Sequence, residues 1–185
     1  LDSNNRREDG YGGDFAGRRR FLDSIIAGVR TRTRPDFQLG VRLSPERFGI
    51  DTGEALELAG SLMTGGDIDY LDMSLWDCWK QPLDPAFAGR PLIELFTELP
   101  RGPAKLGVAG KIMSGSDVTR AFGAGADFAI IGRGAILHHN FPRLYAADPN
   151  FEPAPRPVSR QHLRDEGLSE PFVAYMDNWK GFVAA

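Results

Sequence analysis

The sequence predicts an α/β protein with about four strand–helix units, which would form part of a TIM barrel, the (β/α)8 fold. Short apolar strands alternate with amphipathic helices four times along the chain, and this alternation is typical of parallel sheets. Two of the strands end in glycine, within residues 108–112 and 130–134. Because the last two strand–helix loops of such a barrel commonly hold a phosphate, these glycines indicate an anion site.

The first predicted strand lies between two predicted helices. Apolar residues at helical spacing predict a helix over residues 21–29. Strict alternation over residues 36–44 then predicts a strand. A second helix follows from about residue 53 and ends at the stop signal Gly65-Gly66. The apolar face of this second helix carries Ala55, Leu58, Ala59 and Leu62.

The other units follow the same order. A strand is predicted over residues 68–74, and a short helix begins at Pro91. A strand over residues 105–110 precedes a helix for which Ser116 is the expected N-cap residue. The last strand covers residues 128–132. These units complete about half of an eightfold barrel.

Two regions are expected. Residues 1–150 would form the half-barrel, and residues 151–185 a proline-rich connection and a C-terminal helix that begins at Ser169. The apolar face of that helix would pack on the barrel or on a neighbouring subunit. It consists of Phe172, Tyr175, Met176 and Trp179. A half-barrel has two open edges and an uncovered interior. We therefore expect a missing N-terminal half-barrel or a neighbouring subunit to complete it, and a homo-oligomer.

Composition excludes several classes of partner. The net charge of -3 argues against a general nucleic-acid-binding protein, whose surface would be basic. No apolar run approaches the roughly 20 residues that span a bilayer, and the first residues lack the apolar core of a signal peptide. The single cysteine, Cys78, fits a reducing compartment and a packed, non-nucleophilic position. The expectation is a cytoplasmic protein without nucleic-acid or membrane partners.

Alternation along the strands predicts which side chains face the barrel interior. Arg42 points inward at the carboxyl end of its strand, where barrel active sites lie. Asp72 and Ser74 face inward from the next strand, and Gly107 leaves room on the third. The residues expected to pack under the helices are Phe37, Leu39, Val41 and Leu43. The candidate substrate-pocket residues are Asp72, Ser74 and Trp76.

The candidate cofactor-binding residues lie at the strand ends, and Arg133 adds a planar, permanently charged group suited to phosphate. They are Ala109, Gly110, Lys111, Gly132 and Arg133, and the family resemblance described below adds Arg42. Simpler interpretations stay open. Gly110 and Gly132 could end their strands without binding any ligand, and Arg42 could pair with Asp72. The Lys111 side chain could contact either the phosphate or solvent. No metal site is expected, because the adjacent His138 and His139 would face apart and no third ligand is suitably spaced.

These motifs, taken together with the first residues, resemble the old yellow enzyme (NADH:flavin oxidoreductase) family. Residues 5–13 read NRREDGYGG, and Arg18, Arg20 and Phe21 follow them. The strings GVRLS at 40–44, GKI at 110–112 and GR at 132–133 come in the family's order. Gly17 and Ala109 depart from it, where the family usually has Asn and Gly. The resemblance implies the C-terminal half of an FMN-binding barrel.

The resemblance implies an ene-reductase, which is an FMN-dependent oxidoreductase that uses NADH or NADPH. Such an enzyme reduces an activated, enone-type C=C bond or a related small-molecule electron acceptor. Arg42 would lie beside the N1/O2 edge of the flavin. Backbone amides at 109–111 and 132–133, with the Arg133 side chain, would hold the FMN phosphate. The family's catalytic His, Asn and Tyr residues are expected upstream of Leu1, so the isolated chain would be incomplete and inactive.

Two other readings remain open. One is a different phosphate-binding barrel enzyme, of the isomerase or aldolase type. Such an enzyme would need a lysine or paired carboxylates at the barrel mouth, for which only Asp72 is a candidate. The other is a truncated or non-catalytic half-barrel that is stable only as an oligomer.

Overall fold

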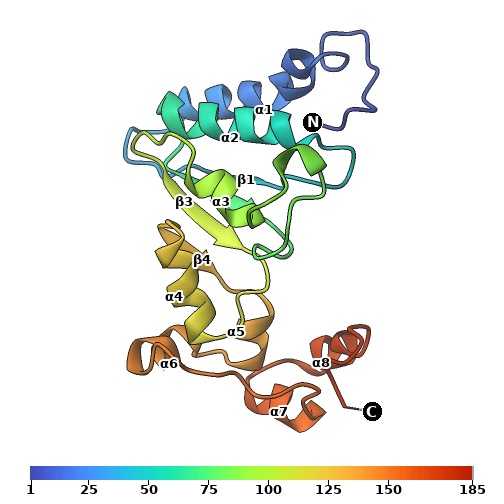
Figure 1. Cartoon of the computed structure of the whole chain (residues 1–185), viewed down its shortest axis with the longest axis vertical. Helices are drawn as coiled ribbons and strands as arrows, with labels where there is room; N and C mark the ends of the chain where they lie inside the picture. Colours follow the sequence, from blue (N-terminus) through green and yellow to red (C-terminus); the bar gives the residue numbers. More distant parts are fainter. Residues whose placement is uncertain (185) are drawn as a thin grey trace.

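The computed structural model describes residues 1–184 and contains one parallel sheet. Its four strands lie side by side in chain order, as expected for consecutive units of a barrel (Figure 1). They are β1 (Gly40–Leu43), β2 (Tyr70–Ser74), β3 (Lys105–Ala109) and β4 (Phe128–Ile130). The register pairs Arg42 with Asp72, and Ser74 with Ala109, so that the predicted inward-facing residues lie next to one another.

Helices connect the strands and continue beyond them. The barrel part contains α1 (Phe15–Arg30), α2 (Thr52–Gly65), the short 3-10 helix η1 (Pro85–Phe87), α3 (Leu92–Thr97) and α4 (Gly115–Gly123). The chain then forms α5 (Arg133–Leu137), α6 (Phe141–Ala147), α7 (Arg160–Asp165) and α8 (Glu170–Met176). No helix of the described residues is both long and apolar enough to cross a membrane.

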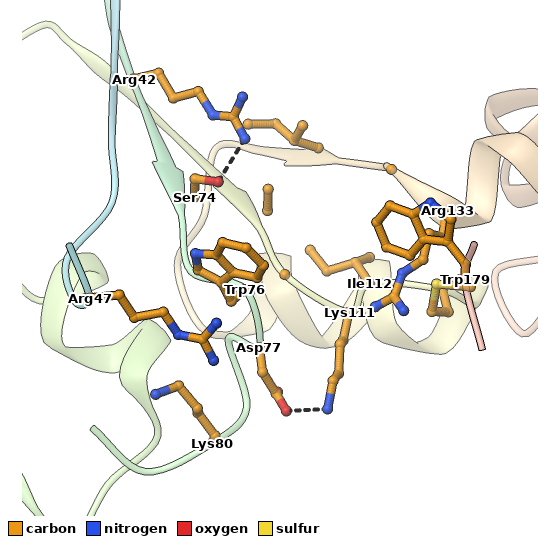
Figure 2. Close-up of a pocket in the computed structure, with 15 residues that line it drawn as sticks. Arg42, Arg47, Ser74, Trp76, Asp77, Lys80, Lys111, Ile112, Arg133 and Trp179 are labelled. Carbon is orange, nitrogen blue, oxygen red and sulfur yellow. Dashed lines mark hydrogen bonds and ion pairs between the residues drawn. The ribbon is translucent and has the colours of Figure 1, made fainter. Parts of the chain in front are cut away.

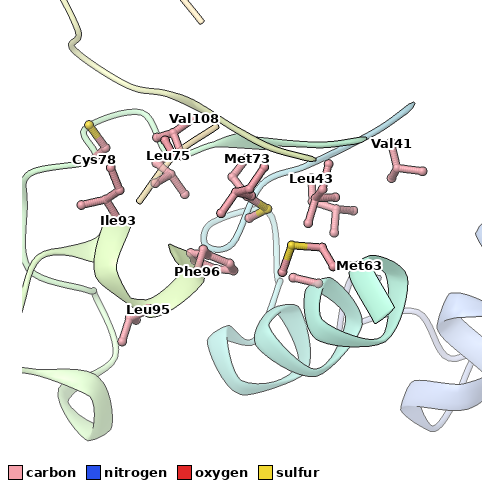
Figure 3. Packing of buried hydrophobic residues seen from close by; sticks show 14 of the residues in the cluster. Val41, Leu43, Met63, Met73, Leu75, Cys78, Ile93, Leu95, Phe96 and Val108 are labelled. Carbon is pink, nitrogen blue, oxygen red and sulfur yellow. The ribbon is translucent and has the colours of Figure 1, made fainter. Parts of the chain in front are cut away.

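The main core lies between the sheet and helices α2 and α3 (Figure 3). Met63 from α2 and Phe96 from α3 are fully buried, as is Met73 from β2. Leu43 of β1 and Val108 of β3 are also buried and extend this core along the face of the sheet that the helices cover. Alternation therefore predicted this face correctly, because each strand turns every second side chain toward the helices.

Local capping explains where the helices begin and end. The Asp51 side chain accepts a hydrogen bond from the Glu54 N–H at the start of α2, and Gly66 ends the helix with a left-handed φ of 81°. The predicted cap of α4 was wrong by two residues. Ser114, not Ser116, is the N-cap, because its hydroxyl and the Asp117 carboxylate satisfy each other's backbone N–H groups in a capping box.

The N-terminal predictions need correction. Helix α1 begins six residues before the predicted start, and Phe21 is 65% exposed. Polar contacts link it to α2, because Arg18 pairs with Glu54 and the Arg19 guanidinium donates to Ser61 at 3.1 Å, while Ile26 is buried in the main core. Strand β1 is shorter than predicted, and Phe37 lies outside it with half of its surface exposed. Hydrophobic alternation alone therefore placed Phe37 wrongly in the core.

Aromatic rings cover the glycines on the inner sheet face. A Cβ atom on Gly40 would meet the Tyr70 ring at 2.1 Å, and one on Gly107 would meet the Phe128 ring at 2.2 Å. The two rings also contact each other edge to face, with centroids 5.8 Å apart. The prediction that Gly107 leaves an open space is wrong, because the Phe128 ring occupies it.

The C-terminal segment has its own hydrophobic cluster. Its buried members are Leu137, Val158, Leu163, Val173, Met176 and Phe182. Helix α8 begins after Ser169 as predicted. Of its expected apolar face, Met176 is buried within the chain, whereas Phe172, Tyr175 and Trp179 are 41%, 51% and 41% exposed, so the packing of that face on a neighbouring subunit stays a prediction. Leu163 of α7 and Phe182 pack with Val173 and Met176 of α8. Sequence periodicity could not anticipate these partners.

Cys78 lies in the core directly behind the strand ends. Its side chain is fully buried, and its thiol donates to the Gly110 carbonyl at 2.9 Å. Burial raises the pKa of this thiol to about 12. The structure thus confirms that Cys78 is a packed residue rather than an activated nucleophile.

We predict that Cys78 resists modification in the folded chain. At pH 8, a thiol with a pKa near 12 carries almost no thiolate, and its burial blocks the reagent. A disulfide reagent such as DTNB should react slowly with native protein and promptly with one thiol per chain in guanidinium chloride. Rapid stoichiometric reaction under native conditions would contradict this packing.

The core predicts a matched pair of stability effects. Phe96→Ala removes a fully buried ring and should lower the free energy of unfolding by about 3–5 kcal/mol. Phe122→Ala changes a ring that is 41% exposed and should have a clearly smaller effect. Urea denaturation followed by circular dichroism measures both. Equal losses for the two variants would argue against the described core.

Candidate active site

An open pocket of about 620 Å³ lies at the carboxyl ends of the strands (Figure 2). Loops that follow all four strands contribute to its wall, because parallel strands direct these loops to the same edge of the sheet. Eight of the nine predicted site residues line it: Arg42, Ser74, Trp76, Ala109, Gly110, Lys111, Gly132 and Arg133. Asp72 is the exception and does not reach the lining.

The pocket wall is strongly cationic. Five basic side chains and one carboxylate, Asp77, line it. Two of the cations have a carboxylate partner closer than 3 Å: Lys111 Nζ lies 2.6 Å from Asp77, and Lys80 pairs with the buried Glu46. Burial alone would raise the pKa of Asp77, but hydrogen bonds from the Lys111 ammonium and the Trp79 N–H hold it below its ordinary value.

Arg42 is oriented by its neighbours on β2. Its guanidinium donates to the Ser74 hydroxyl at 2.7 Å, whereas its Nε lies 3.7 Å from the Asp72 carboxylate. Burial raises the pKa of Asp72, and Arg42 opposes that rise. The expected Arg42–Asp72 pair therefore exists, but it is long, and the head group of Arg42 stays available at the pocket.

The two predicted glycines have different roles. Gly110 has a φ of 147°, and a Cβ atom there would lie 2.9 Å from the backbone nitrogen of Cys78, so glycine is required by close packing. No atom lies within 4 Å of a Cβ atom built on Gly132. The backbone at Gly132 is thus open to a ligand, and Arg133 follows it immediately.

Strained backbone gathers around the pocket. Four non-glycine residues of the described chain have left-handed φ angles, and three of them line the pocket: Arg47 at 69°, Trp76 at 60° and Lys111 at 55°. The fourth, Phe48, follows Arg47. Such conformations each cost of the order of 1–3 kcal/mol and tend to occur at functional sites. Their concentration here supports a binding role for the pocket.

Sequence reasoning missed several pocket residues. Arg47, Asp77 and Lys80 come from loops without periodicity, so only their positions just after strand ends could have indicated them. Trp179 was assigned to the face of a C-terminal helix. It instead follows α8 and reaches the pocket, with its ring 5.8 Å from the Arg133 guanidinium carbon.

The described residues contain no cluster of three side chains suited to a metal ion. His138 and His139 do not face apart as expected. Their Nδ1 atoms lie 3.7 Å and 2.7 Å from the two carboxylate oxygens of Glu166, so both histidines contact one carboxylate.

Comparison with known proteins identifies related folds. The structure of morphinone reductase in complex with tetrahydroNAD aligns with a TM-score of 0.57 and 25% identity, over 83% of this chain and 40% of that chain. The old yellow enzyme homologue NCR from Zymomonas mobilis aligns with a TM-score of 0.58 and 22% identity, over 93% of this chain and 46% of its own. At 22% identity, the similarity to NCR shows a shared fold only.

Among curated proteins, the probable N-methylproline demethylase of Rhizobium meliloti (strain 1021) is 35% identical over 72 residues. That match covers 37% of this chain and 11% of the relative. No family model matches.

The chain spans less than half the length of each of these proteins. Its parallel sheet aligns with their barrels, which confirms the predicted α/β fold of a partial TIM barrel. The fold of the chain is thus similar to part of the barrel of morphinone reductase and of an old yellow enzyme homologue, as the resemblance in sequence predicted.

Proposed function

We propose that the chain forms the phosphate cradle and one flavin-ring contact of an FMN-dependent oxidoreductase that uses NADH or NADPH. The observation that carries this proposal is the shared pocket: Arg42, Gly132 and Arg133 all line it at the carboxyl ends of the strands. Morphinone reductase, a structural neighbour described in complex with tetrahydroNAD, supports the same class of reaction.

The residues of the pocket fit FMN. An anion can approach the backbone at Gly132 because the space around it is open. The Arg133 guanidinium has no carboxylate within ion-pair distance in the described part of the chain, so its charge is available to a phosphate dianion. The volume of about 620 Å³ is in the range of small-molecule sites.

Each residue then has a defined task. Arg133 and the neighbouring backbone amides bind the phosphate, and Lys111, which is held by Asp77, adds positive charge at the same edge. Arg42, which is oriented by Ser74, stabilises negative charge at the flavin-ring edge. When bound, FMN would accept hydride from the nicotinamide and pass it to a small acceptor with an activated C=C bond.

The groups that polarise the acceptor and supply its proton would come from outside this chain. The outer edges of β1 and β4 have no strand partner in the described residues. We propose that a further half-barrel, or a neighbouring subunit, pairs with these edges, because open strand edges otherwise favour aggregation. A homo-oligomer would satisfy the same requirement.

A second candidate reaction is oxidative demethylation of an N-methylated amino acid. The match to the probable N-methylproline demethylase supports it. An isomerase or aldolase has less support, because Lys111 is tied to Asp77 and Asp72 does not line the pocket. Two assays separate the first two reactions. Oxidation of reduced FMN by an enone would support the ene-reductase, and reduction of FMN by an N-methyl amino acid would support the demethylase.

We predict that the chain retains FMN. After incubation with FMN and desalting, the protein fraction should keep a visible absorption band of bound flavin. Free riboflavin should be lost under the same conditions, because it lacks the phosphate that the cradle binds. Loss of both flavins would remove the support for a cradle formed by this chain, and would favour a non-catalytic half-barrel.

Replacement of the cradle arginine should weaken this binding. Arg133→Ala removes a charge-assisted hydrogen bond and should raise the Kd for FMN by about 10- to 150-fold, equivalent to about 1.5–3 kcal/mol. Arg143→Ala is the matched control, because Arg143 is exposed and lies outside the pocket lining. Flavin fluorescence titration measures both. An unchanged affinity in Arg133→Ala would exclude the assigned role.

A further inference from the structure

The loop after β1 is fixed from both sides. Glu46 is 4% exposed and accepts hydrogen bonds from the Lys80 ammonium and from the Leu83 N–H. On the other side, the Ser3 N–H donates to the Gly49 carbonyl at 2.8 Å. The backbone of the two residues between these anchors, Arg47 and Phe48, is therefore held at both ends, while their side chains are exposed.

The same loop is unusually strained. Arg47, Phe48 and Gly49 have consecutive left-handed φ angles of 69°, 52° and 71°. For the two non-glycine residues, this conformation is strained, because the Cβ atom comes close to the following carbonyl oxygen. The strain has a structural consequence, because the turn brings the Arg47 side chain to the pocket wall beside Trp76 (Figure 2).

Arg47 carries a charge that no carboxylate neutralises. In the described part of the chain, no carboxylate oxygen lies within ion-pair distance of it, and Glu46 is engaged by Lys80. Its guanidinium carbon instead lies 4.6 Å from the centroid of the Trp76 ring. Stacking on an indole orients the planar group and leaves its N–H edge free for a bidentate anion.

Arg47 is separate from the cations assigned to FMN. In Figure 2 it lies beside Trp76 and Lys80, whereas Arg133 lies across the pocket beside Trp179. An exposed apolar surface adjoins it: Trp76 is 51% exposed and Phe48 is 68% exposed, with their ring centroids 6.4 Å apart. A guanidinium group next to two aromatic rings can bind the carboxylate of a small, planar carboxylic acid while the rings contact its apolar part.

We propose that Arg47, stacked on Trp76, is a carboxylate subsite for the substrate, and that the unsaturated or aromatic remainder of the substrate lies against Phe48 and Trp76. This proposal rests on the proposed function, because it specifies the class of acceptor that the FMN site would serve. Glu46 is then a positioning residue, since it fixes the loop that holds Arg47.

The test compares two ligands of the same shape. Isothermal titration of the chain, with and without FMN, uses trans-cinnamate and its neutral amide, cinnamamide. Wild-type protein should bind cinnamate at least about tenfold more tightly than cinnamamide, the scale of a charge-assisted hydrogen bond. Arg47→Gln should abolish this preference without changing the affinity for cinnamamide or the retention of FMN.

A matched control is available in the chain. Arg120 also stacks on a tryptophan, with its guanidinium carbon 4.0 Å from the Trp79 centroid, but it lies outside the pocket lining. Arg120→Gln should leave the preference for cinnamate intact. Arg47→Lys keeps the charge but loses the planar fork, so it should retain only part of the preference.

The outcomes separate the two proposals. If wild-type protein fails to prefer cinnamate, or if Arg47→Gln keeps the preference, the carboxylate subsite is wrong whether or not FMN binds. If the preference depends on Arg47 but FMN is not retained, the subsite stands as an anion site and the FMN function fails. A preference lost equally in Arg120→Gln would assign the effect to overall charge and overturn the subsite.

Discussion

The pocket depends on the close approach of two loops at Gly110. The Cys78 N–H and its thiol both donate to the Gly110 carbonyl, at 3.2 Å and 2.9 Å, and the Leu75 N–H donates to Ala109 at 2.8 Å. A side chain at position 110 would push these loops apart, because its Cβ atom would lie 2.9 Å from the Cys78 nitrogen. This contact fixes Trp76 on one side of the pocket floor and Lys111 on the other.

Three guanidinium groups then surround the pocket, and each is oriented by a different kind of neighbour. Arg42 donates to a hydroxyl, Arg47 stacks closely on Trp76, and Arg133 lies near Trp179. None of these neighbours removes the charge, as a close carboxylate would. Lys80 and Lys111 are instead paired closely with the carboxylates of Glu46 and Asp77. The arrangement favours a site for more than one anionic group, such as a cofactor phosphate together with an acidic substrate.

The inner face of the sheet changes character along its length. In the middle, the Tyr70 and Phe128 rings cover Gly40 and Gly107, so this part is filled by side chains like the interior of a closed barrel. At the carboxyl end, small and polar residues leave the pocket open. A further half-barrel would thus meet an aromatic layer beneath the pocket and would complete the site from the other side.

Alternation and glycine-ended strands are local signals, and they were enough to place the four strands of the parallel sheet, helices α1 to α4 and α8, and most of the strand-end residues. Helices α5, α6 and α7 were not predicted. The alternation pattern misplaced Phe37, since burial depends on which elements pack together. The sequence by itself could not identify Arg47 or Trp179 as pocket residues. Left-handed backbone in one loop, and the return of the C-terminal segment to the strand ends, are decided by long-range contacts that no short stretch of sequence encodes.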